Sequence, residues 1–156
     1  MSTPSLKHRA GSALQTIGWK EVIHLPEWGV RSLLAKADTG ARGSALDVSS
    51  MRRVPGNKVE FTIVLDRKNR GAGPTVVADI VRSSRIRSSN GVVQERFVVR
   101  TSVQIGTRKH PVEFSLVNRQ RMICRALLGR HALAGRYLVD SSDKYVHGPR
   151  RKPRAT

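Results

Sequence analysis

The chain has 156 residues, with 29 lysines and arginines against 11 aspartates and glutamates, and a formal net charge of +18 at pH 7. This length suits one domain with a core that needs no disulfides, and the single cysteine, Cys124, excludes an intrachain disulfide. No run of about eighteen apolar residues is present and residues 1–16 do not form a signal peptide, so we expect a cytoplasmic protein without a membrane span.

Short strands separated by turns are expected along most of the chain. They are predicted over residues 17–25, 30–37, 44–48, 58–65, 75–81, 92–105, 108–117 and 133–140, and residues 85–87 could continue the strand at 75–81. One short helix is expected near residues 130–134. This pattern predicts an all-β fold with a closed barrel. The barrel domain is expected to span residues 17–146, between a flexible arm at 1–16 and a basic disordered tail at 147–156.

The positive charge favours a polyanionic partner such as nucleic acid, the ribosome or an acidic peptide, in a salt-dependent association. A solvated basic surface without a specific partner would give the same composition. Aromatic residues are only 4% of the chain, so base stacking on a single strand is poorly supported. We expect Trp19, Trp28 and Tyr137 to pack in the core or in a dimer interface.

The stretch of residues 33–46 carries the most chemical information. An apolar run delivers Asp38 into a turn made by Thr39 and Gly40, and the small residue Ala41 follows. This layout is typical of a catalytic aspartate at the end of a strand, although Asp-Thr-Gly also occurs in ordinary turns. One carboxylate cannot both hold and accept a proton while a water attacks an amide, whereas two that share a proton can.

The second carboxylate is not supplied by a repeat within the chain. No other aspartate is followed by Thr-Gly or Ser-Gly. A two-fold axis through the Asp38 loop would bring each Asp38 against its symmetry mate. We therefore expect the site to belong to a homodimer.

Several separated stretches add to the Asp38 motif, in a fixed order. They are Ile17-Gly-Trp-Lys-Glu, Leu25-Pro-Glu-Trp-Gly, Ala35-Lys-Ala-Asp-Thr-Gly-Ala-Arg, Ser88-Ser-Asn-Gly and Leu127-Leu-Gly-Arg-His-Ala-Leu-Ala-Gly-Arg-Tyr-Leu-Val-Asp. Together they resemble the bacterial retropepsin-like aspartic peptidases that are associated with ATP-grasp glutamate ligases. The resemblance covers residues 17–146 and leaves out only the two ends of the chain.

This resemblance implies a retropepsin-like (acid protease) barrel and peptide hydrolysis by a homodimer. Asp38 would be the catalytic aspartate of each subunit, with Thr39 holding the loop across the dimer axis and Gly40 permitting the tight turn. The apolar-apolar-Gly strand that contains Leu128 and Gly129 would brace the catalytic loop. The mobile flap is not identified, because the loop at 66–74 and the turn at 88–91 are both candidates.

The resemblance also suggests substrate-binding residues. Ala41 would leave room for the substrate backbone, and Arg42 and Arg130 would attract substrate charge. Residues 114–139 contain no acid and five arginines, namely Arg119, Arg121, Arg125, Arg130 and Arg136. If part of this arc lines the cleft, an acidic peptide such as an oligoglutamate tail is a suitable substrate. A charged face without a specific role is the alternative for each arginine.

Two residues depart from the family pattern. Members of this group carry Thr-Ser-Ala-Leu-His after the Ala-Arg pair, whereas this chain has Gly43 in place of the threonine and Asp47 in place of the histidine. Gly43 loosens the segment after the site, and Asp47 adds a charge nearby. Both departures bear on substrate preference and pH dependence more than on the chemistry.

Peptidases of this group have been labelled ATP-dependent zinc proteases, but the spacing of ligands does not support a zinc site. The five histidines and Cys124 are scattered, and there is no His-Glu-x-x-His. No phosphate-binding Gly-rich loop with a lysine is present either. We expect no metal and no cofactor, and any dependence on ATP would belong to a ligase partner.

A hypothesis from another class is a non-catalytic basic β-barrel that binds RNA, the ribosome or another polyanion. It predicts that Asp38→Asn leaves function intact, while raised salt abolishes binding. A peptidase domain whose basic tails localise it near nucleic acid would combine the two hypotheses.

Overall fold

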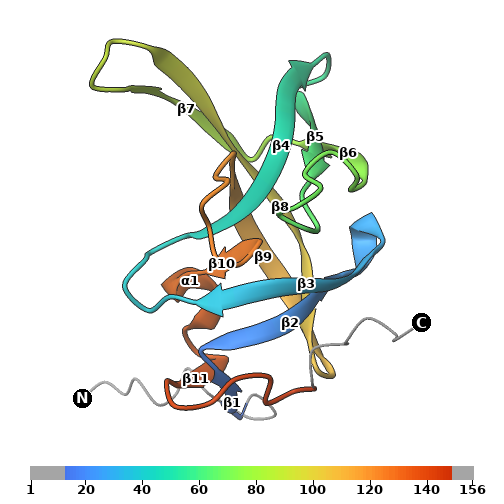
Figure 1. The fold of residues 1–156 in the computed structure, drawn as a ribbon, viewed down its shortest axis with the longest axis vertical. Helices are drawn as coiled ribbons and strands as arrows, with labels where there is room; N and C mark the ends of the chain where they lie inside the picture. Colours follow the sequence, from blue (N-terminus) through green and yellow to red (C-terminus); the bar gives the residue numbers. More distant parts are fainter. Residues whose placement is uncertain (1–12, 149–156) are drawn as a thin grey trace.

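The computed structural model describes residues 13–148 (Figure 1). Its strands are β1 (Gln15–Gly18), β2 (Lys20–Leu25), β3 (Val30–Ala37), β4 (Ser44–Val54), β5 (Lys58–Ile63), β6 (Thr75–Asp79), β7 (Arg82–Arg87), β8 (Val93–Ile105), β9 (Arg108–Val117), β10 (Ala126–Leu128) and β11 (Tyr137–Asp140). A 3₁₀ helix, η2 (Pro26–Trp28), separates β2 from β3, and the α-helix α1 (Arg130–Leu133) follows β10.

Six of these strands close into a barrel. Their order is β10, β3, β2, β8, β9 and β4, and β4 returns to pair with β10. The barrel is mixed, because β10 is parallel to β3 and β4 is parallel to β9, while the other neighbours are antiparallel. The predicted all-β closed barrel with one short helix after residue 129 is thus confirmed.

Three predicted strands differ in detail from the structure. The single strand expected at 17–25 is broken at Trp19, whose N–H donates to the Asp143 carbonyl, and β1 pairs with β11 instead of extending β2. The strand expected at 44–48 continues as β4 to residue 54, and β10 lies between it and β3. Residues 85–87 do not continue the strand at 75–81, because residues 82–87 form a separate strand, β7, that pairs with β8, whereas β6 pairs with β5.

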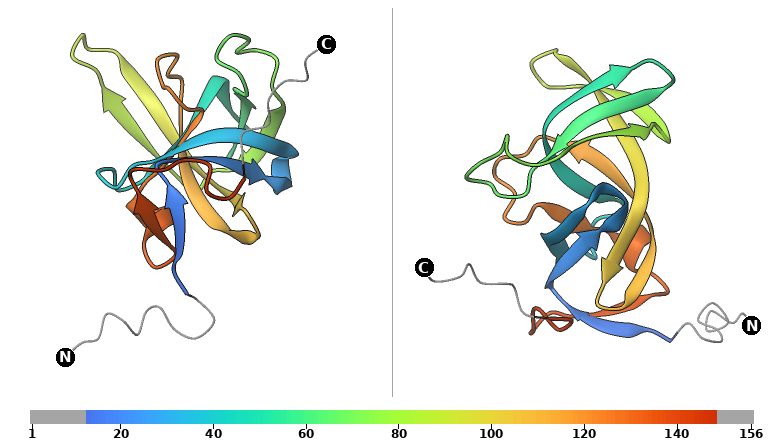
Figure 2. Two further views of the ribbon diagram at one scale, coloured as in Figure 1. Left: turned by 60° about the horizontal axis from the view of Figure 1, so that its bottom comes forward. Right: turned by 90° about the vertical axis from the view of Figure 1, so that its right-hand side faces the viewer.

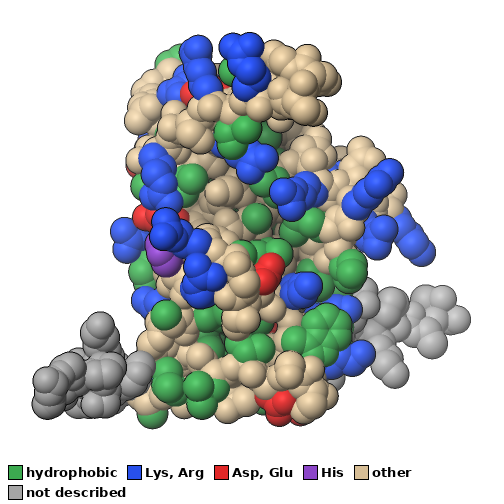
Figure 3. All heavy atoms as spheres, turned by 90° about the vertical axis from the view of Figure 1, so that its left-hand side faces the viewer, with side chains coloured by type: hydrophobic (Ala, Val, Ile, Leu, Met, Phe, Trp, Pro, Cys, Tyr) green, Lys and Arg blue, Asp and Glu red, His purple; other side chains and the backbone are tan. Residues whose placement is uncertain are grey.

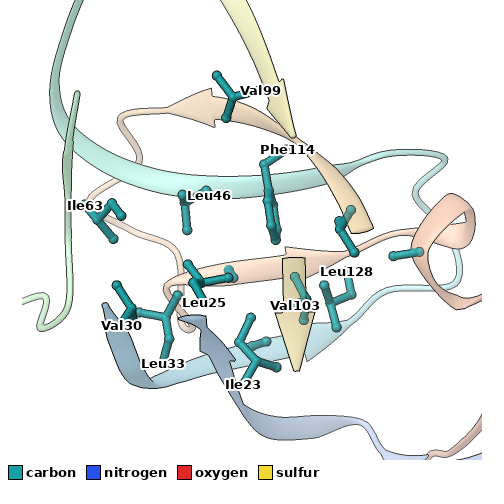
Figure 4. Close-up of a cluster of buried hydrophobic side chains, with 14 of the residues drawn as sticks. Ile23, Leu25, Val30, Leu33, Leu46, Ile63, Val99, Val103, Phe114 and Leu128 are labelled. Atoms are coloured by element: carbon teal, nitrogen blue, oxygen red, sulfur yellow. The ribbon is translucent and has the colours of Figure 1, made fainter. Parts of the chain in front are cut away.

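Alternating side chains build the core. In β5, Val59, Phe61 and Ile63 are fully buried, while the residues between them are half-buried. Similar alternation brings side chains from around the barrel to its centre, Leu46 and Phe114 among them (Figure 4). Each fully buried side chain of this size contributes about 1.5–3 kcal/mol relative to an exposed one. The barrel is therefore a packed core, and functional groups must lie on its loops and rims.

A buried carboxylate occupies one core position of β2. Glu21 is 2% exposed and accepts backbone N–H groups from Gly18 at 2.7 Å, Val146 at 2.9 Å and His147 at 3.3 Å. These bonds replace the water that the charge loses on burial. Glu21 thereby ties the last described residues to the start of the barrel.

The predicted arm and tail lie mostly outside the described residues, apart from 13–16 and 147–148.

Two hairpins extend beyond the barrel (Figures 1 and 2). One contains the ends of β4 and β5 with β6 alongside, and the other contains β7 and the start of β8. All six residues of β7 are exposed, and β8 is its one partner among the described strands.

No helix in residues 13–148 has the length and apolar character needed to cross a membrane.

The small β1–β11 sheet is joined to the barrel by a buried polar pair. His110 on β9 is 8% exposed, and its Nε2 lies 2.7 Å from the Tyr137 hydroxyl on β11, while its Nδ1 has no hydrogen-bond partner within residues 13–148. Burial, with a further contribution from the nearby positive charge of Arg136, lowers the pKa of His110 to about 4. Burial also raises the pKa of Tyr137 to about 12. Both side chains are neutral near pH 7.

We predict that acid destabilises the fold through His110. The unfolded chain takes up this proton near pH 6.5 and the folded chain only near pH 4, so this contribution to stability is complete above pH 6.5 and is lost as the pH falls toward 4. The loss reaches about 3 kcal/mol in urea unfolding. His110→Gln, which can still bond Tyr137, should flatten this part of the pH profile. Parallel profiles for the two proteins would contradict the assignment.

Candidate active site

The Asp38 loop connects β3 to β4 and begins where β3 leaves the barrel. The Asp38 N–H donates to the Leu128 carbonyl at 2.8 Å, which continues the pairing of β3 with β10 by one residue. The Asp38 carboxylate then accepts the Gly40 N–H at 2.9 Å, and the Asp38 carbonyl accepts the Ala41 N–H at 3.2 Å. These bonds fix the turn and hold the carboxylate in one orientation.

The segment that follows β10 braces this loop from the other side. The Arg130 N–H donates to the Ala41 carbonyl at 2.8 Å, and the His131 N–H donates to the Arg42 carbonyl at 3.0 Å. The Arg130 side chain donates from Nη1 to the Thr39 carbonyl at 3.1 Å. Hydrogen bonds from residues about ninety positions later in the sequence therefore hold the Asp38 loop in place.

Gly129 lies where the two segments approach most closely. A Cβ on this residue would lie 2.2 Å from the Gly43 carbonyl oxygen and 2.9 Å from that of Ala41. The Gly129 N–H also donates to the Ser44 hydroxyl at 3.0 Å, in a buried contact. A glycine is required here because there is no space for a side chain. Sequence reasoning missed Ser44, whose only signal was its place after the motif.

The Asp38 carboxylate is available for chemistry. Asp38 is half-buried, and among residues 13–148 it forms no ion pair. Thr39, Gly40 and Arg42 are exposed beside it, and Ala41 is half-buried. An oriented carboxylate at an exposed loop can take a proton from a water molecule or give one to a carbonyl oxygen. The structure brings together all eight predicted site residues, from Asp38 to Arg42 and from Leu128 to Arg130.

Asp47, by contrast, is not a free charge near the site. Its side chain is fully buried, and it accepts two hydrogen bonds from Arg70, at 2.7 and 2.8 Å, and another from Arg125. The Arg119 N–H donates to it as well, at 3.1 Å. The expectation that Asp47 adds a charge near the catalytic loop is corrected by this geometry. Its charge is neutralised inside the protein.

Arg125 links β3, the strand that leads to Asp38, to β4. Its backbone N–H donates to the Leu34 carbonyl on β3 at 3.0 Å, and its carbonyl accepts the Asp47 N–H at 2.9 Å. Its guanidinium pairs with Asp47 and donates to the Met122 carbonyl. Because Arg125 is only 3% exposed, it is a structural residue and does not line the cleft. The sequence identified no partner for Asp47, because 78 residues separate the two.

A cleft of about 360 Å³ adjoins the catalytic loop. Its lining includes Gly43 from the loop, Ser44 at the start of β4 and His131 from α1. It also includes three arginines, Arg82, Arg100 and Arg136, and one acid, Glu113, which pairs with Arg82. Figure 3 shows a face of the molecule on which cationic side chains far outnumber acidic ones. Among residues 13–148, no three side chains that could bind a metal ion gather in one place.

Comparison with known proteins identifies what this chain is similar to. The family model described as "Retropepsin-like aspartic endopeptidase RimB" (RimB-like) matches residues 16–150. A probable alpha-L-glutamate ligase of Shewanella halifaxensis is 32% identical over 135 residues, and one of Parasynechococcus marenigrum is 28% identical over 139 residues. The alignments cover 85% and 87% of this chain but 30% of each relative. The chain thus spans about a third of these relatives.

A solved structure shares the fold. A Legionella pneumophila protein of unknown function (DUF785) superposes with a TM-score of 0.69 and 22% identity, over 85% of this chain and 98% of that one. At this identity the likeness speaks for the fold alone. It agrees with the retropepsin-like barrel that the sequence predicts.

We predict that Gly129→Ala disrupts the catalytic loop. The added methyl group would overlap the Gly43 carbonyl, so the loop must shift, at a cost of about 1–3 kcal/mol. Urea unfolding would measure this cost, and exchange of the Arg130 and His131 amides would report the loop. Gly71→Ala is the matched control, because a Cβ there meets nothing within 4 Å. Equal stability of the two variants would contradict the close contact.

We also predict that Arg125→Met is strongly destabilising. It leaves Asp47 buried with one cation in place of two, and removal of a buried partner costs about 3–5 kcal/mol. Arg52→Met is the control, because Arg52 pairs with Glu60 on the exposed surface, where a pair contributes about 0–1 kcal/mol. Thermal and urea unfolding measure both. Similar losses would contradict a structural role for the Asp47 cluster.

Proposed function

Because the chain belongs to the family of RimB-like retropepsin-like aspartic endopeptidases, we propose that it hydrolyses peptide bonds as a homodimer with one Asp38 from each subunit. The observation that carries the proposal is the Asp38 carboxylate at the end of a barrel strand, which is oriented by the Gly40 N–H and forms no ion pair within the described residues. Nothing in one subunit supplies a second Asp-Thr-Gly. A symmetry mate would supply it.

In this mechanism the two carboxylates share one proton. Packed closely, they cannot both be ionised easily, so one stays protonated while the other is charged. The charged Asp38 takes a proton from a water molecule, which attacks the scissile carbonyl carbon. The protonated Asp38 polarises the carbonyl oxygen and donates its proton to it. Collapse of the tetrahedral intermediate then breaks the C–N bond, and the amine leaves with a proton.

Two surfaces support a dimer. The edges of the β1–β11 sheet are open, since each strand has the other as its partner among the described strands, and Leu138 on β11 is 56% exposed. A strand from a second copy would satisfy the free backbone groups there. Thr39 and Gly40 are exposed at the tip of the catalytic loop and are free to meet their symmetry mates.

The hairpin of β7 and β8 is the better candidate for a flap over the substrate. Its turn at Ser88–Gly91 extends from the same side of the barrel as the catalytic loop (Figure 1), and all of β7 is exposed. The alternative, the loop at residues 66–74, is fastened to the buried Asp47 through Arg70. An anchored loop is less able to open and close than an extended hairpin.

An acidic peptide, such as a glutamate-rich segment, is the proposed substrate. Arg42 follows the Asp38 turn and is exposed. The adjoining cleft is lined by Arg100, Arg136 and Arg82, of which Arg82 pairs with the one acid of the lining, Glu113. These guanidiniums offer paired donors for carboxylates. Arg130 is a weaker candidate for substrate contact, because its side chain already bonds Thr39. Probable alpha-L-glutamate ligases contain a segment homologous to this chain, which supports a functional link to such a ligase.

We predict that Asp38→Asn abolishes cleavage. We also predict that a wild-type subunit paired with an Asp38→Asn subunit is inactive. In an equal mixture after subunit exchange, about half of the wild-type subunits sit in mixed dimers, so activity per wild-type subunit should fall by about half. Cleavage of a panel of glutamate-rich and neutral peptides would measure this, with sedimentation recorded in the same buffer.

Asp79→Asn, a change at an exposed position of β6, is the control and should leave the activity of mixed dimers unchanged. Cleavage by Asp38→Asn, or by a wild-type protein that stays monomeric, would contradict the two-aspartate site. A barrel that binds polyanions without any cleavage would then be the better description.

A further inference from the structure

Two loops from distant parts of the chain lie side by side (Figure 2). Residues 66–70 read Asp-Arg-Lys-Asn-Arg, and residues 118–122 read Asn-Arg-Gln-Arg-Met. Arg70 joins them, because its Nη2 donates to the Asn118 side chain at 2.8 Å while both of its terminal nitrogens bond Asp47. We refer to residues 66–70 and 118–122 as the paired loops. We propose that they bind the phosphodiester backbone of nucleic acid.

The paired loops present uncompensated positive charge. Their exposed cations are Arg67, Lys68, Arg119 and Arg121. Within residues 13–148, none of the four is in an ion pair. The one acid in the loops, Asp66, accepts the Lys68 N–H at 3.0 Å. The acid beneath them, Asp47, is buried and already paired with two arginines. A polyanion would therefore find four exposed cations against one exposed acid, Asp66, in the same cluster.

The chemistry of the loops suits phosphate. Guanidinium groups form paired hydrogen bonds with phosphate oxygens, and amides such as those of Asn69 and Gln120 add donors to phosphate and sugar. Neither loop contains an aromatic residue that could stack on a base. This composition favours contact with the backbone of a duplex, independent of its sequence.

The paired loops are separate from the catalytic loop. The second of them leads into β10 at Arg125, which lies beside Leu34 of β3, whereas Asp38 lies beside Leu128 at the other end of β10. Three residues of extended chain separate Arg125 from Leu128, a distance of about 10 Å. The paired loops and the Asp38 turn are thus connected to opposite ends of β10.

The test compares two variants of the full chain with the same net charge. One changes Arg67, Lys68, Arg119 and Arg121 to glutamine, and the control changes four exposed cations elsewhere to glutamine, namely Arg31, Lys36, Arg87 and Lys109. Both keep every cation outside residues 13–148. Binding to a fluorescent DNA duplex of about 20 base pairs is measured by anisotropy between about 50 and 200 mM salt.

The paired-loop variant should lose affinity about tenfold or more, and its slope of log K against log salt should become shallower by about 3–4, since each phosphate contact contributes about 0.9. The control variant should change much less. Equal losses would overturn the proposal in favour of diffuse charge, and so would a wild type that binds no duplex. Polyglutamate that displaces the duplex with equal efficiency per charge would overturn the assignment to phosphate.

Asp47→Asn tests whether the binding of nucleic acid depends on the arrangement of the paired loops or only on the net positive charge of the chain. It makes the chain more positive, so charge alone would strengthen binding, whereas loosening the two loops should weaken it. Circular dichroism shows whether the variant is folded in the binding buffer. Tighter binding by a folded Asp47→Asn would overturn the role of the paired loops, and the matched four-site variants decide the question if it unfolds.

Discussion

The pairing of β10 with β3 is the constraint on which the candidate site depends. Three residue pairs join the strands, and the bond from the Asp38 N–H to the Leu128 carbonyl extends this pairing into the catalytic turn. The contact requires Gly129, because any side chain there would overlap the Gly43 carbonyl. A loop that would be flexible alone is thereby held at the rim of the barrel, as a positioned carboxylate needs.

The Asp47 cluster is a second support beneath the first. It joins β4, the loop that holds Arg70, and the approach to β10 through one buried carboxylate. Burial of a charge is costly, and the cost is offset here by two guanidiniums and a backbone N–H. Asp47 is thus paired with arginines at 70 and 125. A single residue in the motif cannot be interpreted without these partners.

The same arrangement separates the positive charge by function. Arg125 and Arg70 are used inside the protein, Arg130 supports the catalytic loop, and Arg42 remains exposed beside Asp38. Arg119 and Arg121 are exposed on the loop that leads to β10. Arginines that look alike in the sequence therefore have at least three different environments: buried in an ion pair, bonded to the Asp38 loop, or exposed to solvent. Only some of them are available to a substrate or partner.

The sequence by itself determined the strand periodicity, the closed barrel, the short helix and the family, because alternation, turn residues and the Asp-Thr-Gly motif are local signals. It also indicated Gly129 as a brace through the resemblance. Only the tertiary structure decided the break at Trp19, the extent of β4 and the partners of Asp47. Those features depend on contacts between residues far apart in the chain, and a one-dimensional pattern carries no record of which distant groups meet.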